Sequence, residues 1–146
     1  MTPLPSIKLA FDGQLRYRRA PGFLAPSPLL EVILHSNGNS TPRFPALLDT
    51  GSTRTIFRSE LAESLGIGDL LTFPSIIIQT GGGPFTAYLI DVELELALEN
   101  RNRFACQVGF ANLPRNILGR DIIFYKYLLA FAEQTQLIYY RQGQTG

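Results

Sequence analysis

The sequence predicts a mainly β, barrel-like domain with two short helices. Segments of strand length recur along the chain, turn-forming Gly, Pro and Asn residues separate them, and only two stretches carry helix signals. The chain has 146 residues, of which 45% are hydrophobic and 17% are charged. These values are ordinary for a globular domain with a single core, so we expect one folding unit.

Composition argues against several classes of partner. The formal net charge is +1 and both signs are mixed along the chain, so we expect neither nucleic acid nor a membrane as a partner. No apolar stretch is long enough to span a bilayer, and residues 1–10 lack the hydrophobic run of a signal peptide. The single cysteine, Cys106, has mostly apolar neighbours and is expected to be a small core residue in a reducing compartment. These observations predict a cytoplasmic location.

An N-terminal segment, residues 1–28, is expected to precede the main domain at 29–146. Asp12-Gly13 stands between two alternating segments and predicts the turn of a short β-hairpin. Pro and Gly residues in 21–28 then favour an extended connector. The basic run Arg16–Arg19 is more typical of a solvated strand edge than of a nucleic-acid site.

A second hairpin is predicted from segments 29–36 and 43–50, because Asn37-Gly38 can take the positive φ values of a tight turn. This hairpin places Asp49 at the end of a buried strand, where a carboxylate is costly unless it is hydrogen-bonded. Thr50 offers a hydroxyl that can bond back to the backbone and fix the loop. Gly51 lets backbone amides and a ligand approach the acid.

The remaining elements follow from periodicity and turn chemistry. Residues 57–68 predict a short helix with a Ser59 cap and Gly66 as its stop. Residues 75–98 predict a long hairpin with a glycine-rich tip. After these come a strand at 104–110, a short helix after Gly119 and a closing strand pair around 133–136, the last strand being Gln136 to Tyr140.

Several polar features have simpler interpretations than chemistry. Asp91, Glu93 and Glu95 alternate along one strand and are more typical of a solvated face than of a metal site. His35 has no clustered Cys or His, so structural placement is expected. The glycine run 81–83 is not followed by a helix or a Walker lysine, which argues against a phosphate-binding loop. We predict no metal and no cofactor.

Only one Asp-Thr-Gly occurs in the chain. Chemistry that needs two facing carboxylates would therefore require a second copy related by two-fold symmetry. Three segments, "LLDTGST", "IIIQTGGGPFTAYL" and "NILGRDII", occur in the same order as in the retroviral-type aspartic proteases, or retropepsins, and the chain resembles that family from Leu29 to Tyr140. A lone Asp-Thr-Gly could be a simple turn, but three ordered motifs favour the family.

The resemblance implies a retropepsin-like acid protease barrel, one lobe per chain, that acts as a homodimer on peptide or protein substrates. It implies that Asp49 is catalytic, with one Asp from each subunit. The implied active-site loop is completed by Thr50, Gly51 and Ser52. The implied substrate-binding flap consists of Gln79, Thr80, Gly81, Gly82, Gly83 and Pro84. The implied structural support beneath the loop consists of Leu118, Gly119, Arg120 and Asp121.

Two departures from the family are visible. Viral members commonly carry an acid four positions after the catalytic Asp to pair with the arginine, but this chain has Thr53 there, so Arg120 is expected to pair with Asp121 or with another group. The segment before residue 29 precedes the part of the chain that resembles the family, and we expect no counterpart of it there. We expect the apolar strand Gln136–Tyr140 to pair across the two-fold axis.

Two functions are compatible with these motifs. The first is an aspartic endopeptidase that activates water between two Asp49 carboxylates and can cut its own exposed connector at Phe23-Leu24. The second is a catalytically idle member of the same fold that serves as a dimerisation or peptide-binding module. The intact Asp-Thr-Gly favours the peptidase.

Overall fold

The computed structural model describes residues 10–98 and 102–143. The chain is mainly β, as predicted, with two short α-helices and one 3-10 turn. The elements are β1 (Gly13–Arg16), β2 (Leu29–Ser36), β3 (Asn39–Ser40), β4 (Phe44–Leu48), β5 (Ile56–Arg58), α1 (Glu60–Ser64), η1 (Leu70–Thr72), β6 (Ser75–Thr80), β7 (Gly83–Leu96), β8 (Arg103–Ala111), β9 (Ile117–Leu118), α2 (Ile123–Lys126), β10 (Tyr127–Ala132) and β11 (Leu137–Gln142). No helix among the described residues is long and apolar enough to cross a membrane.

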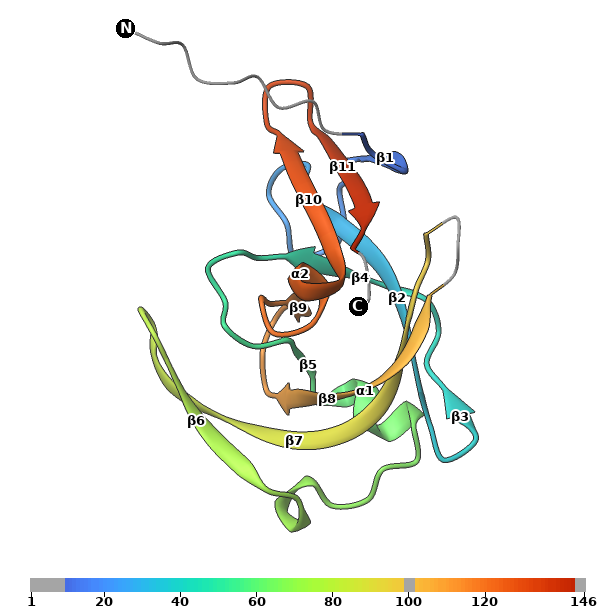
Figure 1. Ribbon diagram of the computed structural model, residues 1–146. Helices are drawn as coiled ribbons and strands as arrows, with labels where there is room; N and C mark the ends of the chain where they lie inside the picture. Colours follow the sequence, from blue (N-terminus) through green and yellow to red (C-terminus); the bar gives the residue numbers. More distant parts are fainter. Residues whose placement is uncertain (1–9, 99–101, 144–146) are drawn as a thin grey trace, which may run out of the picture.

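Six strands close into a barrel. They follow one another in the order β2-β4-β9-β5-β8-β7, and β7 pairs again with β2 to complete the ring (Figure 1). Alternate residues of each strand point inward, as the period of two requires. Val32 and Leu34 on β2 and Leu94 on β7 are fully buried in this core.

A separate three-stranded antiparallel sheet has the order β1-β11-β10. The predicted turn at Asp12-Gly13 is wrong, because Gly13 begins β1 and pairs with Tyr140 near the other end of the chain. A Cβ on Gly13 would lie 2.5 Å from the Tyr140 hydroxyl oxygen, so this glycine is explained by a close approach between strands. Residues 1–9, the first half of the predicted hairpin, lie outside the described residues. The boundary at residue 28 stays a prediction, although β1 is hydrogen-bonded into the sheet of the C-terminal strands.

The closing hairpin is present, but its last strand differs from the prediction. It runs from Leu137 to Gln142, and Gln136 lies in the turn with a φ of 55°. β11 has β1 on one side and β10 on the other. Both of its edges are occupied, so the prediction that this strand pairs with a second chain is wrong.

Local turn chemistry agrees with the prediction at two places. Asn37 and Gly38 have φ values of 52° and 77° between β2 and β3, and Gly66 has a φ of 66° just after α1. Ser59 does stand at the N-cap position of α1, but its side chain makes no capping hydrogen bond. Its backbone is already helical, with φ −57° and ψ −28°, whereas a capping side chain needs an extended backbone.

Cys106 lies on β8 and is partly buried. Burial, followed by the nearby Asp121 carboxylate, raises the pKa of its thiol to about 11. Because only the thiolate reacts with disulfide reagents, we expect labelling at pH 8 to be about 100-fold slower in the folded protein than in denaturant. Equal labelling rates in the two states, measured against a Cys106→Ser blank, would contradict this expectation.

Candidate active site

Asp49 directly follows β4, at the point where this strand lies beside β9. The two strands run parallel, with Leu48 opposite Leu118, and the Asp49 amide donates to the Leu118 carbonyl at 3.0 Å. The acid is therefore positioned by barrel strands rather than by a free loop. Its side chain is only partly buried.

One oxygen of the Asp49 carboxylate is held and the other is open. Oδ1 accepts a hydrogen bond from the Gly51 amide at 2.9 Å. A Cβ at Gly51 would lie 3.1 Å from that same oxygen, so a side chain there would crowd the acceptor. Oδ2 has no hydrogen-bond partner among the described residues, which leaves it available to a bound molecule.

The rest of the loop is closed by Ser52. Its amide donates to the Asp49 carbonyl at 3.2 Å, its hydroxyl donates to the Arg54 carbonyl at 2.7 Å, and its own carbonyl accepts from the Arg120 amide at 2.9 Å. The prediction that the Thr50 hydroxyl fixes the loop is wrong for the described chain. Thr50 is exposed, and its hydroxyl makes no hydrogen bond to a described residue.

Thr55 joins the loop to its support and was missed by the sequence analysis. This fully buried threonine accepts from the Gly119 amide at 3.1 Å and donates to Asp121 Oδ1 at 2.7 Å. A Cβ at Gly119 would lie 2.3 Å from the Arg54 carbonyl oxygen. Leu118, Gly119 and Asp121 thus lie against the loop as the resemblance implied. The sequence offered one signal for this role: Thr55 is a polar residue directly before the apolar pair Ile56-Phe57.

Arg120 is placed differently from the expectation. Its side chain is exposed and forms no ion pair within the part of the chain that the structure describes. No ion pair joins it to Asp121, whose Oδ1 accepts a hydrogen bond from the Thr55 hydroxyl. Arg120 and Thr53 instead line an open cavity of about 660 Å³ beside the loop. The other residues that line it are Thr50, Asp121, Phe124 and Tyr125.

The predicted flap is the tip of the β6–β7 hairpin. Gln79 pairs with Pro84 and Thr80 pairs with Gly83, which leaves Gly81 and Gly82 at the end. Gly83 has a φ of 108°, which only glycine adopts readily, and its carbonyl accepts from the Thr80 hydroxyl at 2.7 Å. In Figure 1 this tip projects to the left, on the same side as the segment between β4 and β5 that carries Asp49.

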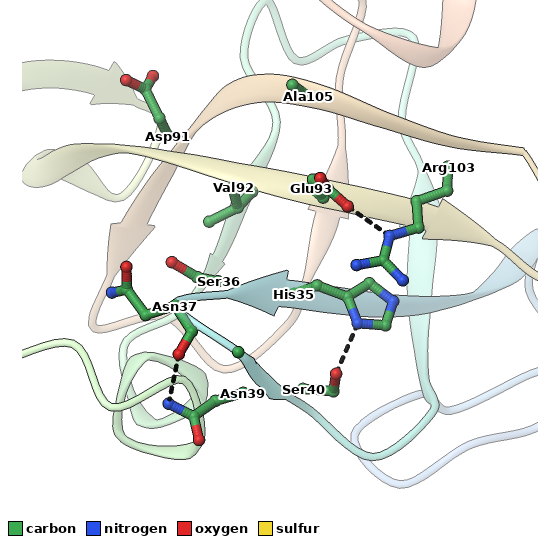
Figure 2. Close-up of a pocket in the computed structure, with 11 residues that line it drawn as sticks. His35, Ser36, Asn37, Asn39, Ser40, Asp91, Val92, Glu93, Arg103 and Ala105 are labelled. Atoms are coloured by element: carbon green, nitrogen blue, oxygen red, sulfur yellow. Dashed lines mark hydrogen bonds and ion pairs between the residues drawn. The ribbon is translucent and has the colours of Figure 1, made fainter.

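A second cavity, of about 460 Å³, lies near β3, away from the flap tip (Figures 1 and 2). His35 lines it, and its Nδ1 is 2.6 Å from the Ser40 hydroxyl while its Nε2 is 3.0 Å from Glu95 Oε1. Glu93 forms an ion pair with Arg103 (Figure 2). His35 therefore links three strands, as its structural interpretation predicted. Among the described residues, no group of three or more His, Cys, Asp and Glu side chains could hold a metal ion.

Comparison with known proteins agrees with this geometry. The model of a family described as aspartyl protease matches residues 32–122, more than half of the chain. The chain is similar in structure to a retropepsin-like aspartic protease from Rickettsia conorii, with a TM-score of 0.56, 17% identity, and 87% of this chain and 98% of that chain covered. EIAV protease complexed with the inhibitor HBY-793 is similar with a TM-score of 0.51 and 20% identity, over 70% of this chain and 89% of that chain. No curated protein sequence matches. The closed barrel, the Asp-Thr-Gly loop and the family match agree, and the chain belongs to the retropepsin-like aspartyl protease family.

Proposed function

We propose that this protein is a homodimeric aspartic endopeptidase that hydrolyses peptide bonds in extended polypeptides. One observation carries the proposal. The chain contributes one Asp49, whose Oδ1 accepts a hydrogen bond from the Gly51 amide while its Oδ2 has no partner among the described residues. The neighbouring Thr50 is exposed. One such acid is half of a two-carboxylate site. A second copy, placed by two-fold symmetry, supplies the other half.

Two carboxylates about 3 Å apart cannot both ionise, so the pair holds one proton. The ionised Asp49 takes a proton from a water molecule as that water attacks the peptide carbonyl. The protonated Asp49 donates its proton to the carbonyl oxygen. The bond from Oδ1 to the Gly51 amide keeps each carboxyl oriented during this exchange.

The flap supports an extended substrate. Its tip is exposed and lies on the same side of the molecule as the segment between β4 and β5 (Figure 1). An extended peptide can add as a strand between the flap and the catalytic loop, with main-chain hydrogen bonds giving affinity without a fixed sequence. Flap closure would also exclude water from the site.

Subunit mixing tests the shared site. Wild-type protein that cleaves a denatured protein is mixed with a ninefold excess of Asp49→Asn chains and allowed to exchange subunits. Random pairing is expected to lower the activity per wild-type chain about tenfold, because mixed dimers hold one functional acid. Activity unchanged by the mixing overturns the shared site. A wild-type protein that cleaves nothing, under any condition of pH, favours the idle module.

Self-cleavage at Phe23-Leu24 is expected to be slow. Leu24 is 98% exposed, but the segment turns at Pro21-Gly22 rather than running extended, and the Phe23 ring lies 4.6 Å from the Arg115 guanidinium carbon. Cutting therefore requires local opening of this contact. We expect Arg115→Ala to speed the cut several-fold, followed by intact mass, with Asp49→Asn as the uncut control. If each of the three proteins keeps its own full-length mass, the cut is ruled out.

A further inference from the structure

Two cavities adjoin on the surface of the barrel, away from the catalytic loop. One, of about 460 Å³, is the cavity beside β3 that Figure 2 shows. The other, of about 390 Å³, extends toward the segment before β6. Ser36, Asn37 and Asp91 line both cavities, so the two form one continuous groove, which we call the side groove. None of the residues 49–52 or 79–84 lines it.

Hydrogen bonds hold the walls of the side groove in place. The Asn39 side-chain amide donates to the Leu65 carbonyl at 3.2 Å and so ties the turn between β2 and β3 to the end of α1. On the other side β2 pairs with β7, and His35 bonds to both Ser40 and Glu95. Walls that are already ordered lose little conformational entropy when a ligand binds, so the groove is suited to binding as it stands.

Asp91 presents an unpaired carboxylate where the two cavities meet. Its side chain is exposed and makes no hydrogen bond or ion pair to a described residue. Glu93 also lines the groove, but it is paired with Arg103 at the other end of the 460 Å³ cavity (Figure 2). Ser36 and Asn37, which lie at the same end as Asp91 in Figure 2, add side-chain oxygens that can accept hydrogen bonds. A cation that donates hydrogen bonds complements this end of the groove.

Apolar side chains line the 390 Å³ cavity beyond Asp91. Ile67 and Phe73 are partly buried and pack against the core. Pro74 and Leu89 complete the apolar surface. Lysine and arginine side chains carry apolar stems beneath their charged groups, so they can lie along such a surface with the charge at Asp91. The groove thus offers a place for a cation and, next to it, a place for an apolar side chain.

We propose that the side groove binds a polypeptide segment in which a lysine or arginine stands beside an apolar residue. The ammonium or guanidinium group pairs with Asp91, and the apolar side chain lies against Phe73 and Leu89. The two cavities together have room for more than one side chain, which favours an extended segment over a lone amine. This site goes beyond the proposed function, because it needs neither Asp49 nor a second copy of the chain. In an active peptidase it would hold a protein substrate by a segment away from the cut bond and raise the effective concentration of that substrate.

An NMR titration tests the site. The probe is the peptide acetyl-Gly-Phe-Lys-Phe-Gly-amide, added to isotope-labelled Asp49→Asn protein so that the peptide is not cut. We expect saturable shifts of the backbone amide signals of Asn37, Gly68 and Gln107, which line the groove. The same peptide with norleucine in place of lysine should bind about threefold more weakly, because it lacks the charge that pairs with Asp91. The titration records binding alone, so its result stands whether or not the wild type cleaves a denatured protein.

Charge variants in the same background test the role of Asp91. Asp91→Asn keeps the size of an exposed side chain and should raise the dissociation constant of the lysine peptide about threefold. Arg103→Gln should lower it, because this change frees Glu93 and gives the groove a second unpaired carboxylate. Glu63→Gln is the matched control, since it removes the same charge from an exposed position on α1 that lines neither cavity. Equal dissociation constants for Asp91→Asn and Glu63→Gln, or no saturable shift at the groove amides, would overturn the site.

Discussion

Asp49→Asn is expected to lower cleavage of a denatured protein by about 10³-fold or more, because an amide can neither hold nor release the shared proton. The loop should keep its shape. The asparagine Oδ1 can still accept the hydrogen bond that Asp49 Oδ1 now accepts from the Gly51 amide at 2.9 Å. The measurement is the initial rate of cleavage across pH, wild type beside the variant.

Asp49→Asn should lose activity without losing stability. Replacing two acids that crowd each other in the dimer removes like-charge repulsion, so thermal unfolding and sedimentation should be unchanged or slightly improved. Wild-type cleavage should be fastest at mildly acidic pH, where the pair holds one proton, and should fall on both sides of that range. Undiminished cleavage by the variant would contradict the mechanistic assignment.

The features predicted well from sequence are those fixed by neighbours in the chain. Asn37-Gly38 makes its turn because the two residues themselves allow positive φ. The flap hairpin follows from a glycine run between two strand-forming segments. Asp49 was found because its Thr-Gly context is local, and the structure indeed places Gly51 against its carboxylate.

The features missed depend on partners far away in the sequence. Asp12-Gly13 has the composition of a hairpin turn, but Tyr140 offers Gly13 a strand partner that no local pattern encodes. Arg120 was expected to pair with Asp121 or with another group, but Asp121 Oδ1 accepts a hydrogen bond from Thr55, a residue 66 positions away in the sequence. Side-chain pairing of this kind is decided by packing, which local periodicity does not specify.

The place of the closing strand in its sheet is a further example. The closing strand begins with the apolar run Leu137–Tyr140, and its sequence alone gives no reason why it should not be an edge. β1 pairs with one side of this strand and β10 with the other, so β10 and not β11 lies at the edge of the sheet. This outcome depends on β1, which belongs to the N-terminal segment before residue 29.

Gly119→Ala is expected to destabilise the protein by about 3 kcal/mol or more. A Cβ there would lie 2.3 Å from the Arg54 carbonyl oxygen, 2.5 Å from its carbonyl carbon and 2.9 Å from its amide nitrogen. All three are backbone atoms, so no side-chain rotation relieves the overlap. The two segments must separate, which breaks the bond from the Gly119 amide to the buried Thr55 hydroxyl.

Activity should fall further than stability in Gly119→Ala. The next amide, Arg120, donates to Ser52 at 2.9 Å, so separating these segments displaces the loop that carries Asp49. Gly68→Ala is the matched control, since nothing lies within 4 Å of its added Cβ. Its unfolding free energy should stay within about 0.5 kcal/mol of wild type, with full cleavage. Denaturant unfolding gives the free energy of unfolding of each variant. Cleavage rates are then compared under conditions in which both variants are folded. Equal stability of the two variants would show that Arg54 yields at little cost and that the catalytic loop does not need its glycine support.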